Sequence, residues 1–303
     1  MAKFAVVVGG CIGDALGAPW ETKSPLNPTL IAWDGLFKDG GTFWKGNAGN
    51  YTDDGKMLCC ISRSLIRSHG FDPSDAAAEY LAWYKTLETR GIGSTTATAM
   101  ENLKLGYSWE TSGLVGDKFG GNGTAMRVAP IGIVYRNDMV KLLEVAQLDA
   151  QITHNSLEPK VGSMAVALGT ALLSHQNMMP EDVLDAVIEV VPSSVVKNKL
   201  IAAKYHLEND TDPKAALLDI GTSGYVPETV GAAFYCLCRN DNFNDIVIMA
   251  VRGGKDADTT SAVAGAMAGA FYGLDGIDRY YKDNVEDFDI LAKLDEELTN
   301  IEI

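Results

Sequence analysis

Two segments of this 303-residue chain are apolar almost all the way around a helix, and they constrain its fold more than any other feature. They are residues 229–238 (TVGAAFYCLC) and 259–272 (TTSAVAGAMAGAFY). A helix without a polar face has to be surrounded by other elements. The sequence therefore predicts two central helices, with the other elements packed around them.

Several further segments carry apolar residues at the three- and four-residue spacing of helices. They are residues 57–68, 75–86, 144–150, 161–174, 180–190, 195–208 and 213–218. The strand candidates, AVVV near residue 5 and IVYR near residue 133, both merge into helical spacing. We therefore predict an all-α fold with glycine-rich loops, and one domain over residues 1–303 because neither a repeat nor a linker interrupts the sequence.

Charge and cysteine content limit the partners that we expect. The chain has 25 Lys and Arg against 40 Asp and Glu, which gives a formal net charge of -15. Such a surface repels phosphate backbones, so nucleic acid is an unlikely partner, whereas divalent cations suit it. Five cysteines without framework spacing indicate reduced thiols, and no apolar run reaches membrane-spanning length. We expect a cytoplasmic protein.

Two acidic motifs lie at predicted helix starts. They are Thr52-Asp53-Asp54, before a helix expected from about Gly55, and Asp256-Ala257-Asp258-Thr259, before the second apolar segment. Taken singly, each motif is most simply explained by helix capping. Together they offer more carboxylates than capping needs, and buried carboxylates are costly unless a cation compensates them. An all-oxygen set favours Mg, Mn or Ca over Zn.

A third acidic pair is found near the N-terminus in the segment GDALGAPWE. Asp14 and Glu21 would share a face if the whole segment were helical, but Pro19 predicts that the helix ends before Glu21. Taken alone, Asp14 is explained equally well as a cap or as an ion-pair partner.

Seven segments in order resemble the ADP-ribosylglycohydrolases, a family that includes ADP-ribosylarginine and ADP-ribosylserine hydrolases and the dinitrogenase reductase-activating glycohydrolase. They are GGCIGDALGAPWE (9–21), YTDDGKM (51–57), RGIGSTT (90–96), GGNGTAMRVAPIG (120–132), ITHNS (152–156), GTSGYVPETVGAA (221–233) and GGKDADTTSAVAGAMAGAFYG (253–273). The resemblance implies a single domain of mostly orthogonal helices around a central binuclear metal site.

The resemblance also implies the residues of the site. Two divalent ions, Mg or Mn, would be held by Thr52, Asp53, Asp54, Asp256, Asp258 and Thr259. Catalysis would involve Glu21, Asp53 and Asp54, while the role of Asp14 would be structural. The loop Gly120-Gly121-Asn122-Gly123 would bind pyrophosphate, His154 would lie near the adenosine end, and Tyr225 would lie near the bond to be cleaved. Without the resemblance, the loop is a tight turn, His154 a structural residue and Tyr225 a core aromatic.

Three residues depart from the family pattern. Gly55 replaces a threonine after the first acidic motif, where we expect only a local effect on the helix start. Lys255 replaces a glycine beside the second motif, and its ammonium group either weakens a metal site or points to solvent; we expect the latter. Gly91 stands where arginine-cleaving relatives carry an aspartate, which weakens the expectation of an arginine substrate.

The resemblance implies a metal-dependent hydrolase that removes ADP-ribose from a modified protein or from a small-molecule conjugate by cleaving the glycosidic bond at C1″. Carboxylates would supply acid and base chemistry there. One alternative is a non-catalytic member of the family that binds ADP-ribose or has a structural, crystallin-like role. Another is a different metallohydrolase that acts on nucleosides or nucleotides.

Overall fold

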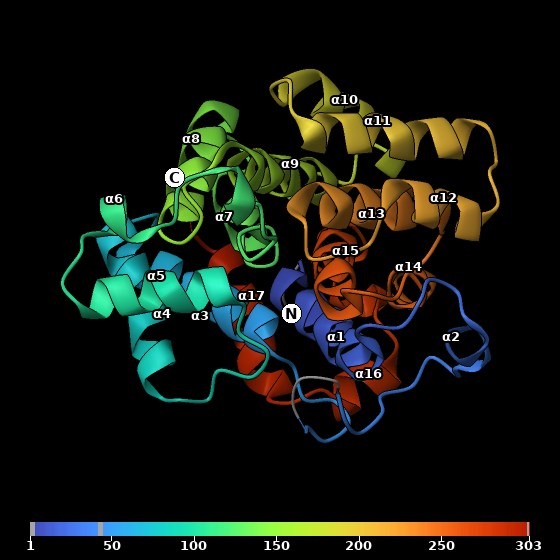
Figure 1. Ribbon diagram of the computed structural model, residues 1–303, viewed down its shortest axis with the longest axis horizontal. Coiled ribbons are helices and arrows are strands. Elements are labelled where there is room, and N and C mark those ends of the chain that lie inside the picture. The colour runs from blue at the N-terminus through green and yellow to red at the C-terminus, as the bar shows by residue number, and fades with distance from the viewer. Residues whose placement is uncertain (1–3, 42–44, 302) are drawn as a thin grey trace.

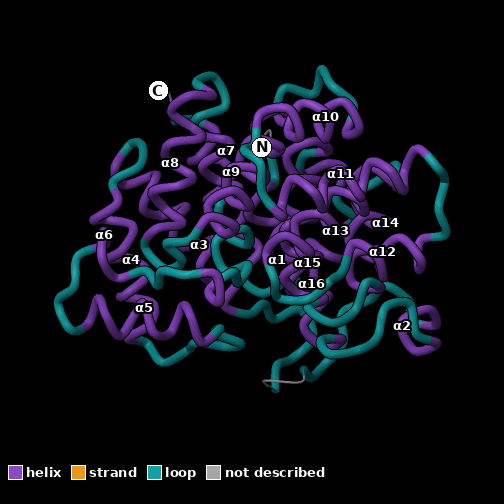
Figure 2. The backbone as a smooth tube through the Cα atoms, turned by 45° about the horizontal axis from the view of Figure 1, so that its top comes forward, coloured by secondary structure: helices purple, strands orange, loops and turns teal. Residues whose placement is uncertain are grey.

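The computed structural model describes residues 4–41, 45–301 and 303, and it confirms the all-α fold (Figure 2). Over these residues there is no β-strand, only two isolated bridges, and the helices pack into one compact domain. The N-terminal half contains α1 (Val6–Gly17), α2 (Pro28–Ala32), α3 (Asp53–Ser68), α4 (Pro73–Lys85), α5 (Ser94–Lys104), α6 (Trp109–Ser112), α7 (Ala129–Val134) and α8 (Met139–Gln151). The C-terminal half contains α9 (Leu157–Ser174), α10 (Pro180–Val190), α11 (Val195–Glu208), α12 (Pro213–Ile220), α13 (Val226–Arg239), α14 (Phe243–Arg252), α15 (Ala257–Tyr272), α16 (Arg279–Asn284) and α17 (Phe288–Thr299). Three short 3-10 helices cover Ala18–Trp20, Asp117–Phe119 and Leu274–Gly276.

The two apolar segments belong to α13 and α15, and both helices are buried along nearly their whole length. The helices α10 and α11 have the predicted bounds because proline or serine marks their starts. The helix expected from Gly55 begins at Asp53 instead. Neither strand candidate forms a strand: AVVV begins α1 after its N-cap Ala5, and IVYR runs from the last residues of α7 into a turn.

The centre of the molecule is the antiparallel pair α1 and α15 (Figure 1). Glycines let the two backbones touch. A Cβ on Gly9 would clash with the carbonyl of Gly265, and one on Gly13 would clash with the carbonyl of Ser261. At the end of α1, a Cβ on Gly17 would contact the backbone of Asp258. This close approach places the C-terminal end of α1 against the acidic start of α15.

The C-terminal helix α17 closes the other end of this pair. Its Asp295 is buried and accepts hydrogen bonds from the backbone N–H groups of Val7 (2.9 Å) and Val8 (3.0 Å). These groups belong to the first turn of α1, where no helical acceptor exists for them. The carboxylate therefore caps α1 from a distant part of the chain. In the described part of the chain, no helix has both the length and the hydropathy needed to cross a membrane.

Candidate functional site

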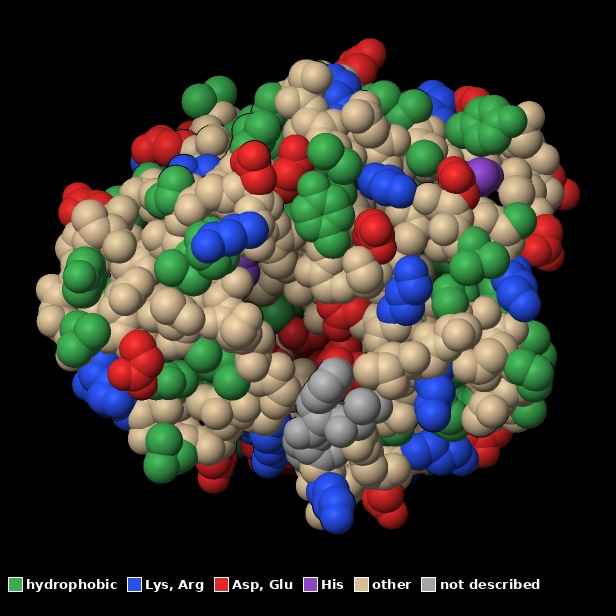
Figure 3. Space-filling model, viewed as in Figure 1, with side chains coloured by type: hydrophobic (Ala, Val, Ile, Leu, Met, Phe, Trp, Pro, Cys, Tyr) green, Lys and Arg blue, Asp and Glu red, His purple; other side chains and the backbone are tan. Residues whose placement is uncertain are grey.

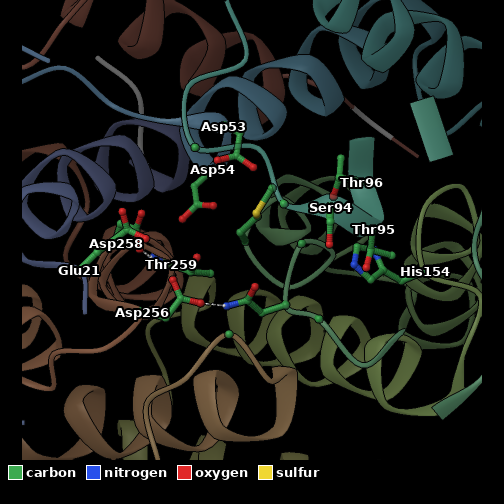
Figure 4. A pocket seen from close by; sticks show the side chains of 17 residues that line it. Glu21, Asp53, Asp54, Ser94, Thr95, Thr96, His154, Asp256, Asp258 and Thr259 are labelled. Carbon is green, nitrogen blue, oxygen red and sulfur yellow. Dashed lines mark hydrogen bonds between the residues drawn. The ribbon is translucent and has the colours of Figure 1, made fainter. Parts of the chain in front are cut away.

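A cavity of about 260 Å³ opens on one face of the molecule, and acidic side chains gather in its hollow (Figure 3). One end carries the carboxylates, and the other carries hydroxyl groups and one histidine (Figure 4). Its lining residues are Glu21, Asp53, Asp54, Gly91, Gly93, Ser94, Thr95, Thr96, Gly121, Asn122, Gly123, Met126, His154, Gly224, Asp256, Asp258 and Thr259. The cavity therefore unites all seven segments that carry the family resemblance.

The start of α3 presents Asp53 and Asp54 to the cavity, and α1 holds this start in place. The buried carboxylate of Asp14 accepts hydrogen bonds from the N–H groups of Thr52 and Gly55, both at 2.8 Å, and from the Thr52 hydroxyl at 2.9 Å. The same hydroxyl caps the helix by accepting from the N–H of Asp54. Asp14 thus fixes the direction in which both aspartates point.

The start of α15 supplies the second group of oxygens. The helix begins at Ala257, so Asp256 is its N-cap residue, and Asp258 and Thr259 lie in its first turn. Asp256 is held by the side-chain amide of Asn122, which donates to Oδ2 at 2.7 Å. The same amide also donates to the Thr229 hydroxyl at 2.9 Å. A residue of the glycine loop therefore positions one of the carboxylates.

These side chains form two clusters of three carboxylates each, and one residue belongs to both clusters. Ligand atoms of Asp14, Asp54 and Asp258 lie within 4.8 Å of one another, and so do those of Glu21, Asp256 and Asp258. Two neighbouring clusters joined by Asp258 are the arrangement that two adjacent cations would need.

The charge balance of this end of the cavity favours a cation. Burial above all, and then the neighbouring carboxylates, raise the pKa values of Asp54 and Asp258 well above their usual range. Burial likewise raises the pKa of Glu21 to about 8 and that of Asp14 to about 6. Asp54 Oδ2 is buried without a hydrogen-bond partner among the described residues, and no Lys or Arg lines the cavity there. The carboxylates therefore fit divalent cations with oxygen preference.

Without metal ions, the stability of the protein should fall as the pH rises. The folded-state pKa values of Asp14 and Glu21 lie above their ordinary values of 3.8 and 4.5, so folding takes up protons. Their contribution to stability is complete below about pH 4 and is lost as the pH rises through about 6 and 8. We expect the melting temperature of chelator-treated protein to fall between about pH 5 and 8, and saturating Mg or Mn to remove most of this fall. Parallel curves with and without metal in thermal melts would contradict a cation site.

The opposite end of the cavity holds a neutral histidine. Burial, and then the charge of Arg127, lower the pKa of His154 to about 3. Nδ1 of His154 lies 2.9 Å from the hydroxyl of Thr153, which also accepts from Arg127 at 3.0 Å. Because the Thr153 hydroxyl accepts from Arg127, its own proton is free to bond to Nδ1, and in that tautomer the ring proton lies on Nε2. Nε2 faces Gly121, whose added Cβ would lie 3.1 Å from it.

A buried ion pair supports this end from behind. Arg127 donates through Nε to Asp149 Oδ2 at 2.9 Å, and Tyr80 donates to the other oxygen at 2.7 Å. Arg127 also donates to the carbonyl of Gly123 at 2.9 Å, and both charged side chains have no exposed surface. One guanidinium with four hydrogen bonds thus joins the glycine loop to the segment that carries His154.

Three predicted site residues lie outside the cavity lining. Thr52 is buried behind it, where its hydroxyl is bonded to Asp14. Gly120 and Tyr225 line a neighbouring cavity, and a Cβ on Gly120 would lie 2.7 Å from the tyrosine ring. The structure thus places Tyr225 against the glycine loop rather than beside the carboxylates, and the roles proposed for these residues stay predictions.

The segment Gly91–Thr96 lines the cavity, although no role was predicted for its residues. It precedes and begins α5, and it presents Gly91, Gly93 and the hydroxyl residues 94–96. The sequence signal was the GIGSTT pattern, because glycine followed by hydroxyl residues is typical of a helix start. Met126 and Gly224 also line the cavity without a comparable signal.

The three departures from the family pattern have different structural settings. A Cβ on Gly55 would lie 2.5 Å from the Tyr51 ring, so the tight packing of that ring requires glycine at the start of α3. Gly91 adopts φ +77°, and its Cβ would lie 2.9 Å from Asp53 Oδ1. Lys255 is exposed and lies outside the acidic cavity, as expected for the solvent-directed alternative.

The all-α fold and its acidic, oxygen-lined cavity define a class of helical proteins with a site suited to divalent cations. A model of the ADP-ribosylglycohydrolase family matches residues 4–302, and the chain belongs to this family. It is 28% identical to the ADP-ribosylarginine hydrolase Tri1 of Pseudomonas putida, over 98% of this chain and 77% of that protein. It is also 28% identical to the ADP-ribosylhydrolase ARH3 of Mus musculus, over 95% and 89% of the two chains. A solved structure titled ADP-ribosylglycohydrolase-related protein complex superposes with a TM-score of 0.79 at 26% identity, over 99% of this chain and 98% of that one.

Proposed function

We propose that this protein is a metal-dependent hydrolase that releases ADP-ribose from a modified side chain or a small conjugate by cleaving the glycosidic bond at C1″. The observation that carries the proposal is the difference between the two ends of the cavity. Two clusters of carboxylates that share Asp258 lie at one end, and a glycine loop with a neutral histidine lies at the other. The names of the relatives, two of them ADP-ribosyl hydrolases, support the same activity.

Two divalent ions, Mg or Mn, are part of the proposal. Asp54 and Asp258 would contribute to one site, Glu21 and Asp256 to the other, with Asp258 shared between them; Thr52, Asp53 and Thr259 complete the predicted ligand set. Bound there, the ions would orient the ribose hydroxyls and lower the pKa of a bound water. The unpartnered Oδ2 of buried Asp54 supports this assignment, because a buried carboxylate oxygen without a donor requires compensation.

The remaining residues would bind and orient the substrate. Gly121 and Gly123 lack side chains, which lets backbone groups approach a pyrophosphate closely. In the tautomer with its proton on Nε2, His154 would donate a hydrogen bond to a ligand at the same end of the cavity. Glu21 lines the acidic end and is our candidate, with Asp53 and Asp54, for moving a proton at the glycosidic bond.

The alternative of a non-catalytic family member is less well supported. A protein that served only as a scaffold would not need several buried carboxylates in contact with a cavity, because they destabilise the fold without a cation. Lys255, the one sequence feature that opposed an intact metal site, lies outside the cavity. We also propose a cytoplasmic location without nucleic-acid partners, consistent with five buried free cysteines and the acidic charge.

A substrate panel tests the proposed activity. The protein would be incubated with peptides ADP-ribosylated on Arg, Ser or Asp/Glu and with an ADP-ribosylated nucleobase, each in Mg, in Mn and in excess chelator. We expect release of free ADP-ribose from at least one substrate with metal and none with chelator. Binding of ADP-ribose without release from any substrate would favour the non-catalytic alternative, whereas chelator-resistant release would contradict the metal requirement.

A further inference from the structure

A second depression adjoins the acidic end of the cavity. It has a volume of about 330 Å³ and is lined by Glu21, Thr22, Ser223, Gly224, Lys255 and Asp256. Three of these residues, Glu21, Gly224 and Asp256, also line the acidic cavity, so the two spaces are direct neighbours. His154 and the hydroxyl residues lie at the far end of the cavity (Figure 4). If a ligand spans the cavity from His154 to the carboxylates, the part of the ligand that extends beyond the carboxylates would therefore enter this depression.

Among the described residues that line the depression, Lys255 is the only cationic one, and it occupies an unfavourable backbone conformation. Its φ is +52°, in the left-handed region, where a residue with a side chain is strained and glycine is not. Gly254 before it also has positive φ. A lysine in place of the family's glycine therefore lowers the stability of the fold at this position. In exchange, the lysine adds a positive charge.

The backbone around Lys255 is fixed by its neighbours. Its N–H donates to the carbonyl of Lys23 at 2.7 Å, and its own carbonyl accepts from the N–H of Thr22 at 2.6 Å. Leu26 donates to the carbonyl of Arg252 at 2.8 Å, which ties the same two segments together once more. The position of the Lys255 backbone at the rim is therefore set, although its side chain is exposed and forms no ion pair with a described residue.

We propose that this depression receives the acceptor, the group from which ADP-ribose is removed, and that Lys255 makes the enzyme prefer acceptors with negative charge next to the modified residue. This inference rests on the proposed function. Glu21 and Asp256 face the same space, but their charge would be compensated by the proposed cations, whereas that of Lys255 would not. Coulomb attraction between the ammonium group and an acidic flank then favours such substrates at low salt.

Matched peptides test the preference. Two peptides would carry the same ADP-ribosylated residue, of the type that the substrate panel shows to be cleaved, flanked by Glu in one and by Lys in the other. For the wild-type protein we expect kcat/KM to favour the acidic peptide by about fivefold, the size of one or two exposed charge contacts. Lys255→Gly should bring the ratio close to one, and Lys255→Glu should invert it. Lys214→Glu, at an exposed lysine of α12 outside both spaces, should leave it unchanged.

The outcomes separate this inference from the proposed function. Release from neither peptide by the wild-type protein would overturn the proposed function, and the inference with it. Release with the same ratio in the wild type and both Lys255 variants would overturn the acceptor preference alone. Thermal melting of the metal-free proteins gives a readout independent of activity: Lys255→Gly should melt at the same or a higher temperature, because glycine relieves the backbone strain. A lower melting temperature would show that Lys255 serves the fold, which would also overturn the inference.

Discussion

Replacing Asp258 with asparagine should lower kcat/KM for ADP-ribose release by roughly 1,000-fold, which corresponds to about 4 kcal/mol of lost transition-state stabilisation. Asp258 belongs to both clusters of carboxylates, so its loss weakens both proposed cation sites at once. Asparagine keeps the oxygen that accepts from the N–H of Thr259 at 2.9 Å, so the helix start should remain intact. Steady-state kinetics and metal titration of the purified variant measure the effect.

Two controls distinguish this effect from loss of the fold. Metal-free Asp258→Asn should melt at the same or a higher temperature than the metal-free wild type, because one buried carboxylate has left a repelling cluster. Asp289→Asn, at an exposed aspartate in the first turn of α17, should keep full activity. Full activity of Asp258→Asn in metal-limited buffer would refute the ligand assignment.

Replacing Arg127 with methionine should lower the free energy of unfolding by about 3–5 kcal/mol, because it leaves the buried carboxylate of Asp149 without its cation. The carboxylate would keep the hydroxyl of Tyr80 but lose both the charge and the bond from Arg127 Nε. The carbonyl of Gly123 would lose a donor as well. Urea unfolding followed by circular dichroism measures the difference.

Arg67 offers a matched control for this substitution. It pairs with Asp75 and Glu79, but its side chain is 49% exposed, so Arg67→Met should cost less than about 1 kcal/mol. The double variant Arg127→Met, Asp149→Asn should recover part of the lost stability, since it no longer buries an unpaired charge. Equal costs for Arg127→Met and Arg67→Met would contradict the role of the buried network.

Sequence patterns predicted elements best where local signals agree. Residues 180–190 and 195–208 are helices with the predicted bounds, because apolar periodicity coincides with Pro180 and with the cap residue Ser194. The start of α3 was misplaced by two residues, since Asp53 and Asp54 interrupt the apolar pattern. Helix α5 was missed because its buried residues, Thr96, Ala99 and Met100, are too few to give a clear apolar stripe.

The candidate site could be predicted only in part, for a similar reason. The carboxylates of both acidic motifs line the cavity, as the resemblance implied. These motifs could be recognised in the sequence because each consists of a few adjacent residues. Tyr225 was expected near the bond to be cleaved; it lines a neighbouring cavity, against Gly120, and its role stays a prediction. The direction of such a side chain depends on the loop that packs against it, which no local pattern describes.

The sequence by itself determined the helical class, the burial of α13 and α15, and the segments that bring carboxylates to the cavity. These properties follow from periodicity, capping and composition, which act between residues close in the chain. Only the tertiary structure decided that α1 and α15 touch through glycines, that Asp14 holds the start of α3, and that Asp54 and Asp258 share one cluster. The physical reason is that burial and the distances between charges are set by packing of remote segments, and these two quantities determine whether carboxylates merely cap helices or can hold a cation.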